Sequence, residues 1–277
     1  MSKPPASSPS KDSLILLSRL LLAPPEYHVL TSGSSGLARK LTEITREEFD
    51  DAVTLANSNH VIVRAMEVFL QAMCEAGDGR RAEWAENALS AERARIRTAM
   101  GFLREVCDGF VQEGYDVTVI KSLDHWPDLG SDLDLYTNAG SEQVVQMMKG
   151  RFQARIAPRS WGDRLACKWN FLLPGLPEAI EIHMGRLGQT GEQLVIAAAI
   201  AGRARQVLIE DRTYRVAAVS DRLMISTLQR MYRHFYFRLC DIVDTAELSE
   251  SGAIDFRDLR SAADAAGIWE GVATYLV

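Results

Sequence analysis

Residues 130–135 read Gly-Ser-Asp-Leu-Asp-Leu, and this run decides how the rest of the chain is interpreted. In a β-strand, Asp132 and Asp134 would point from one face while Leu133 and Leu135 anchor the opposite face. Two carboxylates with overlapping reach suit Mg²⁺, which proteins usually hold through one or two carboxylates and the phosphates of a substrate. An isolated Asp-x-Asp is also typical of a solvated strand end, so the neighbouring segments decide between these interpretations.

Two further strands are predicted, one on each side of this run. Upstream, Tyr115–Ile120 is rich in β-branched and aromatic residues and leads directly into Lys121-Ser122. Downstream, Ala179–Met184 alternates, which places Glu181 and His183 on one face and isoleucines in the core. The sequence therefore supplies a third acidic residue on a second strand.

The order of these segments resembles the nucleotidyltransferase superfamily related to DNA polymerase β, whose core contains a Gly-Ser or similar turn, an Asp-x-Asp strand and a third acidic strand. A largely uncharacterised bacterial family of this superfamily is more similar, because it combines a Lys-Gly turn, a Gly-Asp-Ile-Asp-Leu-like run, an Asp/Glu-x-His strand and a helical tail. The similarity covers roughly residues 50–277. The matching residues are Lys121-Ser122, Ser131–Leu135, Glu181-Ile182-His183, and Arg233-His234 through Arg238-Leu239 to Asp244.

Two positions depart from the pattern of that family. Ser122 stands where glycine is usual, which changes how closely the backbone can approach a phosphate. Ser131 replaces the common glycine directly before the first aspartate.

The resemblance implies an enzyme that transfers an NMP from ATP or another NTP to an acceptor hydroxyl, with release of pyrophosphate. Mg²⁺, or Mn²⁺ in its place, would be held by Asp132, Asp134 and Glu181, which are also the predicted catalytic residues. Glu181 is equally compatible with a role as general base for the hydroxyl proton, because its position alone does not separate the two roles.

The predicted nucleotide-binding residues include a turn and a basic stretch. Lys121 and Ser122 occupy the turn, and Ser131 precedes the aspartate pair. The basic stretch over 149–168 ends with Lys168, in a predicted strand over 167–171, where an ammonium can reach a phosphate as a point charge. The alternative for each lysine is an ordinary surface position, and for the basic stretch a solvated loop.

Three residues of the helical tail and one histidine of the core complete the candidate site. Arg233, His234 and Arg238 recur at helical spacing among aromatic residues, which we interpret as core rather than as a base-stacking platform. The resemblance implies that Arg233 and Arg238 bind the nucleotide and that His234 lies beside them. His183 shares the face of Glu181, where it is either a neighbour of the metal or a structural histidine.

The predicted fold class is α+β, with a mixed-sheet polymerase β-like nucleotidyltransferase core at 114–219 between helical regions at 14–113 and 220–277. Helices are predicted over 42–113, with a break at Gly77-Asp78-Gly79, and over 221–248 and 255–266. A hairpin is predicted from 207–209 to 213–219. Residues 1–13 are predicted to form a disordered tail, and 31–36 a Ser/Gly loop that lacks a Walker lysine.

The charge of the chain favours a small-molecule acceptor. There are 37 acidic and 31 basic residues, a formal charge of −6, whereas binding to DNA or tRNA requires a dominant basic surface. Two alternatives remain: a toxin-type nucleotidyltransferase that acts on tRNA or protein, and a non-catalytic nucleotide-binding protein. The second is disfavoured because carboxylates packed together repel one another without a cation.

Cysteine spacing and hydropathy bear on localisation. The four cysteines lie far apart without a Cys-x-x-Cys pair, which predicts reduced thiols in a cytoplasmic protein. The apolar stretch over 14–23 is too short to span a bilayer, so no interaction with a membrane is expected.

Overall fold

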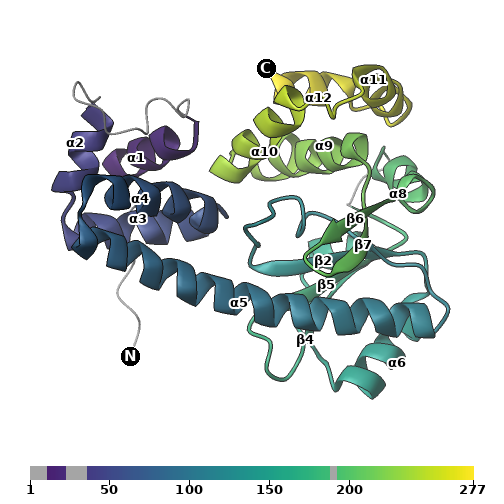
Figure 1. Cartoon of the computed structure of the whole chain (residues 1–277). Helices are drawn as coiled ribbons and strands as arrows, with labels where there is room; N and C mark the ends of the chain where they lie inside the picture. Colours follow the sequence, from purple (N-terminus) through teal and green to yellow (C-terminus); the bar gives the residue numbers. More distant parts are fainter. Residues whose placement is uncertain (1–10, 23–35, 188–191) are drawn as a thin grey trace. The chain divides into compact units, whose positions relative to one another are not determined.

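The structure is a computed structural model that describes residues 11–22, 36–187 and 192–277 (Figure 1). It is an α+β protein in which helices precede, interrupt and follow a seven-stranded mixed sheet, as the predicted fold class requires. The chain divides into two compact units, residues 1–95 with 238–243 and residues 96–237 with 244–277. None of the described helices combines the length and the apolar character needed to cross a membrane.

The first unit is helical. It contains α1 (Lys11–Leu22), α2 (Gly36–Glu43), α3 (Arg46–Ser58), α4 (Ile62–Ala76) and the first part of α5 (Gly79–Gln112). The predicted disordered tail is wrong for residues 11–13, because they form the first turn of α1, where Asp12 suits the positive end of the helix dipole. Residues 1–10 and 31–35 of the predicted tail and loop lie outside the described residues.

Local signals set the ends of the helices in this unit. Thr45 caps α3, since its side chain accepts a hydrogen bond from the Glu48 backbone N–H while the Glu48 carboxylate accepts one from the Thr45 N–H. Gly77, at φ 70°, ends α4 in the left-handed conformation. The predicted break at Gly77–Gly79 is therefore confirmed, and α5 begins at Gly79.

The sheet belongs to the second unit and has the order β3-β4-β5-β2-β1-β7-β6. Its central strand β2 pairs in parallel with β5 and antiparallel with β1. The strands are β1 (Thr118–Val119), β2 (Asp132–Thr137), β3 (Arg155–Ile156), β4 (Lys168–Leu172), β5 (Ala179–Met184), β6 (Arg205–Ile209) and β7 (Arg212–Val216).

The predicted β segments are found, and one of them is shorter than predicted. β2 carries the Asp-x-Asp pair, and β4 matches the strand predicted over 167–171 to within one residue. β5 has the predicted bounds, and β6 and β7 form the predicted antiparallel hairpin. The strand predicted over Tyr115–Ile120 is reduced to Thr118–Val119, whose register partners in β2 are Tyr136 and Leu135. Tyr115 instead donates its N–H to the Phe110 carbonyl at the end of α5.

The helices of the second unit are α6 (Ser141–Phe152), α7 (Trp161–Leu165), α8 (Glu192–Arg203), α9 (Val219–Thr227), the π-helix η2 (Leu228–His234), α11 (Phe256–Ala265) and α12 (Trp269–Leu276). α10 (Leu239–Glu250) begins in the first unit and ends in the second. The single helix predicted over 221–248 is wrong. It is interrupted at Phe235, which adopts φ 58° and donates its N–H to the Arg230 carbonyl.

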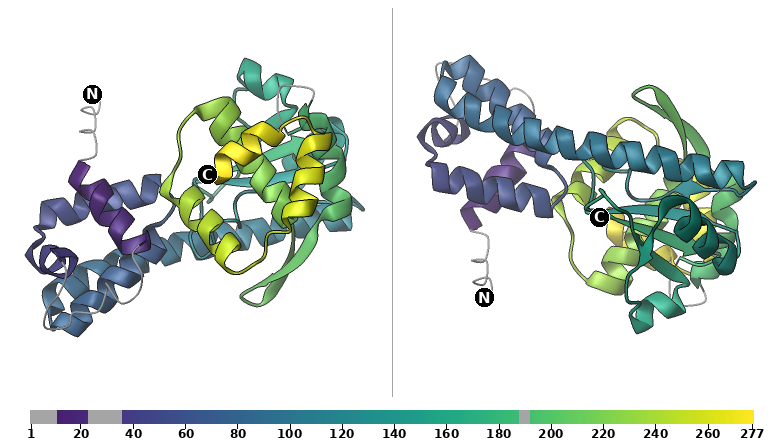
Figure 2. Two further views of the ribbon diagram at one scale, coloured as in Figure 1. Left: turned by 90° about the horizontal axis from the view of Figure 1, so that it is seen from above. Right: turned by 90° about the horizontal axis from the view of Figure 1, so that it is seen from below.

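In the second unit, helices cover both faces of the sheet. The C-terminal part of α5, with α6, lies on one face, and α8, α9, α11 and α12 lie on the other (Figures 1 and 2). A hydrophobic cluster joins Ile120, which directly follows β1, and Tyr136 of β2 to buried residues of α8, α9, α11 and α12. Asp132, Asp134 and Tyr136 are alternate residues of β2. Because alternate residues of a strand point to the same face, the two aspartates also point to this second face.

Candidate active site

The register of β2 and β5 places the predicted acidic residues on neighbouring strands. Asp134 pairs with Glu181, and Asp132 pairs with Ala179 two residues earlier. The leucines of β2 and the isoleucines of β5 are completely buried, so they fix the opposite face of both strands in the core. Asp134 and Glu181 are consequently both buried and lie on one face of the sheet.

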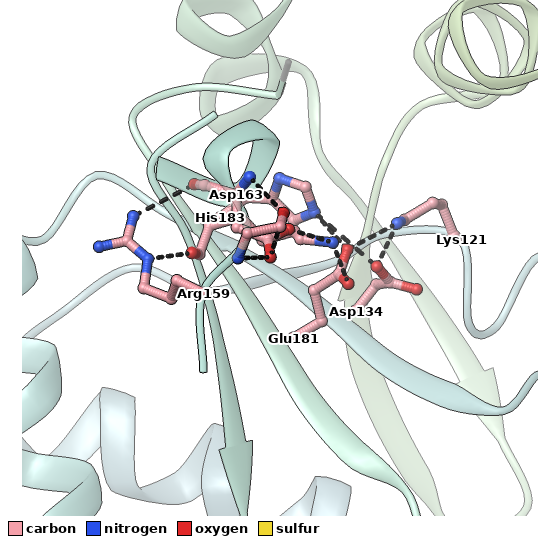
Figure 3. Close-up of polar contacts among 8 residues, drawn as sticks. Lys121, Asp134, Arg159, Asp163, Glu181 and His183 are labelled. Atoms are coloured by element: carbon pink, nitrogen blue, oxygen red, sulfur yellow. Dashed lines mark hydrogen bonds and ion pairs between the residues drawn. The ribbon is translucent and has the colours of Figure 1, made fainter. Parts of the chain in front are cut away.

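The Lys121 side chain lies against both of these carboxylates (Figure 3). Its Nζ atom forms an ion pair with Asp134 Oδ1 and lies 3.2 Å from Glu181 Oε1. Burial opposes the charge of the ammonium, but the attraction of Asp134 and Glu181 outweighs this and raises the pKa of Lys121. Lys121 is therefore a cation bound between two anions.

A second lysine holds the other oxygen of Glu181. Lys168 Nζ lies 2.7 Å from Glu181 Oε2 and 3.1 Å from Asp163 Oδ1. Asp163 is itself held at the start of α7, where its carboxylate accepts hydrogen bonds from the Ser160 N–H and hydroxyl at 2.8 and 2.7 Å. These contacts make a continuous line of alternating charges from Asp163 to Asp134.

Arg159 fixes the backbone around this second lysine (Figure 3). It donates hydrogen bonds to the carbonyls of Lys168 at 2.9 Å and Asp163 at 3.1 Å. Its guanidinium also lies 4.1 Å from the centre of the Trp169 ring, a cation–π contact. Arg159 therefore contributes to the position of Lys168 without touching Glu181 itself.

His183 contacts both acidic residues from β5. Its Nε2 atom lies 2.9 Å from Glu181 Oε1 and 3.8 Å from Asp134 Oδ1. The histidine is buried, with 4% of its surface exposed. The structure thus brings together five of the predicted site residues, which are Lys121, Asp134, Lys168, Glu181 and His183.

The two buried carboxylates differ in acidity. Burial opposes ionisation of Glu181, but Lys121 and His183 outweigh it and hold the pKa of this carboxyl below its usual range. For Asp134, burial raises the pKa, the attraction of Lys121 offsets only part of that effect, and the charge of Glu181 adds to it. Glu181 is therefore the carboxylate that stays ionised most readily.

Three residues of this group lie close enough together to hold a metal ion. One carboxylate oxygen each from Asp134 and Glu181 and one nitrogen of His183 lie within 4.8 Å of one another. Asp132 is not part of this group and is exposed at the start of β2. Partial loss of water around its carboxyl, together with the charges of Asp134 and Glu181, raises the pKa of Asp132.

Ser122 has a structural contact in the turn. The Ser122 hydroxyl accepts a hydrogen bond from the Asp134 N–H at 2.6 Å and donates one to the Asp132 carbonyl at 3.3 Å. It thereby holds the backbone at both aspartates. Ser131, in contrast, is exposed just before β2.

The predicted residues of the helical tail do not belong to this contact network. Arg233 and His234 lie in the last turn of η2 and are exposed. Arg238 falls in the first compact unit, where its guanidinium contacts His60. The basic side chains that contact Asp134 and Glu181 within the described part of the chain are Lys121, Lys168 and His183.

Comparisons with known proteins leave the interpretation to this geometry. No protein-family model and no curated protein sequence matches the chain.

One buried residue of the network, Asp163, was not predicted as a site residue. Burial opposes its ionisation, but the Ser160 hydrogen bonds and Lys168 hold the pKa of Asp163 below its usual range. A signal for its local position exists, because Ser160-x-x-Asp163 has the spacing of a helix capping box. The capping box gives no indication that the other oxygen of Asp163 reaches Lys168.

Proposed function

We propose that the chain is a metal-dependent nucleotidyltransferase with a polymerase β-like core, which transfers an NMP from an NTP to a hydroxyl of a small-molecule acceptor. The observation that carries this proposal is the pairing of Asp134 with Glu181 on adjacent parallel strands, with Asp132 two residues before Asp134. The mixed sheet with β2 between β1 and β5 supports the polymerase β-like core.

In the proposed reaction the acceptor oxygen attacks the α-phosphorus of the NTP. The new P–O bond forms as the bond to the β-phosphate breaks, and pyrophosphate leaves. A bound Mg²⁺ or Mn²⁺ would neutralise the charge that develops on the phosphates. Asp132, Asp134 and Glu181 would hold it, while Lys168 keeps Glu181 oriented through the Oε2 atom.

The surroundings of Glu181 favour a ligand over a general base. A general base works best when its pKa lies near the working pH. Burial alone would raise the pKa of Glu181. Lys121 and His183 outweigh that effect and hold this pKa below the usual range. We therefore propose that the acceptor proton passes to solvent or to a phosphate oxygen rather than to Glu181.

A non-catalytic nucleotide-binding protein is the second candidate, and one observation favours it. The repulsion expected between the unused carboxylates is offset by Lys121 and Lys168, which supply positive charge without a metal. The presence of the acidic residues in this chain therefore does not by itself require that the protein is a catalyst.

Radiolabel transfer distinguishes these candidates. The full chain is incubated with each of four α-labelled NTPs, Mg²⁺ and a cell extract, and the labelled product is identified. We expect label in small metabolites, because the net charge of −6 does not favour a polyanionic acceptor. Label in tRNA or protein would support the toxin-type alternative, and NTP binding without transfer would support the non-catalytic one.

Lys168→Ala is expected to weaken binding of ATP, GTP, CTP and UTP by a similar factor. The ammonium has three N–H donors, and Asp163 and Glu181 account for two, which leaves one for a phosphate oxygen. Loss of a charged hydrogen bond costs about 1.5–3 kcal/mol, and a phosphate contact carries no information about the base. Calorimetry with the four nucleotides measures this factor.

Lys11→Ala, at the exposed first residue of α1, is the control for removal of a lysine. Thermal unfolding of both variants shows whether the chain remains folded. Weakened binding of a single nucleotide would assign Lys168 to the base pocket instead of the phosphates.

A further inference from the structure

Three potential ligand atoms lie within 4.8 Å of one another on the face of β2 and β5. Asp134 Oδ1, Glu181 Oε1 and His183 Nε2 belong to residues that are 8%, 7% and 4% exposed. The Nε2 atom lies 2.9 Å from the Glu181 oxygen and 3.8 Å from the Asp134 oxygen. Two hard oxygen donors and one imidazole nitrogen are a donor set suited to a first-row transition metal.

The Lys121 ammonium contacts the same two oxygens. It is ion-paired with Asp134 Oδ1 and lies 3.2 Å from Glu181 Oε1, the oxygen that also faces His183. Lys168 instead contacts Glu181 Oε2, on the other side of the carboxylate. A cation bound by Asp134 and Glu181 through these inner oxygens would therefore meet Lys121, and not Lys168.

The charges of the group leave room for a divalent cation. Asp132, Asp134, Asp163 and Glu181 supply four carboxylates, against two ammonium groups from Lys121 and Lys168. With all six of these groups ionised, two negative charges remain. In a site of low dielectric constant, an ammonium and a metal ion that share the same oxygens also repel each other strongly.

We propose that Asp134, Glu181 and His183 form a divalent-cation site for which the Lys121 ammonium is an internal competitor. Binding of the cation releases Lys121, and under the proposed function the freed ammonium can then pair with the phosphates of the NTP that accompanies the metal. The cation site itself does not depend on nucleotidyl transfer. It goes beyond the predicted carboxylate site because His183 is a ligand and Lys121 sets the affinity.

The nitrogen ligand gives the site a preference for Mn²⁺ over Mg²⁺. Imidazole suits transition metals, whereas Mg²⁺ favours carboxylate and water oxygens. Binding at Nε2 places the imidazole proton on Nδ1, which is buried and has no hydrogen-bond partner among the described residues. We therefore expect His183 to contribute moderately to the affinity for Mn²⁺, by about tenfold. This is within the range found when groups around a bound metal are mutated.

Mn²⁺ binding to the full chain without nucleotide tests the competition. Free Mn²⁺ is measured by electron paramagnetic resonance, and Mg²⁺ affinity follows from displacement of Mn²⁺. Lys121→Met is expected to tighten binding of both metals by about tenfold or more, because the lost ion pair involved charged, buried partners. Lys11→Met is the control, and its affinities should equal those of the unmodified chain.

Lys121→Gln provides a second variant if Lys121→Met does not fold, since the amide retains a hydrogen-bond donor without the charge. The same increase in affinity is expected. Unchanged or weaker metal binding in a folded Lys121 variant would overturn the competition, as would the absence of any binding at millimolar Mn²⁺ in both the unmodified chain and that variant.

His183→Gln tests the ligand role separately. The glutamine oxygen can reach the position of Nε2, so the substitution exchanges a nitrogen donor for an oxygen donor. We expect Mn²⁺ binding to weaken about tenfold while Mg²⁺ binding changes little, so the preference for Mn²⁺ disappears. An equal loss for both metals, or no loss for either, would show that His183 is structural. Because no nucleotide is present, these results stand apart from the transfer assay.

Discussion

Replacing Asp134 with Asn is expected to remove nucleotidyl transfer while the chain remains folded. The variant loses a carboxylate that would hold the metal, and with it several kcal/mol of charge stabilisation in the transition state. A loss of about 4 kcal/mol corresponds to roughly a thousandfold lower turnover. The fold should tolerate the change, because burial already opposes ionisation of Asp134 and Lys121 keeps its contact with Glu181.

Asp132→Asn is expected to act in the same direction, and Asp211→Asn is the control. Asp211 is exposed in the hairpin turn between β6 and β7, where its ion pair with Arg104 contributes little. Turnover is measured with the preferred α-labelled NTP, and folding is followed by circular dichroism. Retention of activity in folded Asp134→Asn would contradict the proposed site.

The second large effect concerns stability. Glu181→Gln keeps the size of the side chain but removes the charge that Lys121, Lys168 and His183 surround. Removing one partner of a buried ion pair costs about 3–5 kcal/mol, because the remaining charge stays buried without compensation. We expect the free energy of unfolding, measured in urea at neutral pH, to fall by this amount.

Glu113→Gln, at an exposed position after α5, should change the free energy of unfolding by less than about 0.5 kcal/mol. If Glu181→Gln changed the free energy of unfolding as little as this control, the charge network would not be a significant source of stability.

The difference between Glu181→Gln and the unmodified chain should also depend on pH. The pKa of Glu181 is lowered in the folded chain by Lys121 and His183, against the effect of burial. A lowered folded pKa stabilises the protein above the unfolded pKa of about 4.3, and this stabilisation is lost as the pH falls toward the folded value. We therefore expect the full difference above about pH 5 and a smaller difference at pH 3 to 4. A difference that grows with acid would contradict this assignment.

The sequence alone determined the segments that carry the acidic residues. Alternation in Ala179–Met184 predicted β5 with its correct bounds, because the period of two is a local property of a strand. The same alternation placed Asp134 on the face opposite to the buried leucines of β2. Gly77 also marked the end of α4, since glycine adopts positive φ at low cost.

Two features of the fold have no local signal in the sequence from which they could be predicted. The kink at Phe235 occurs at a residue that rarely adopts positive φ, with no glycine or proline to indicate it. Tyr115 and Val117 have strand-forming side chains, but without a neighbouring strand they form no ladder. In both places tertiary contacts override local propensity.

The composition of the candidate site was decided by strand order and register. β5 pairs with β2 on one side and β4 on the other, which brings Glu181 beside Asp134 and Lys168 beside His183. The sequence identified these residues as candidates, but Lys121 was assigned to phosphate rather than to the carboxylates. Which ammonium group contacts which carboxylate depends on the pairing of strands that are far apart in the chain. Burial then makes the resulting ion pairs strong. Only the tertiary structure contains that information.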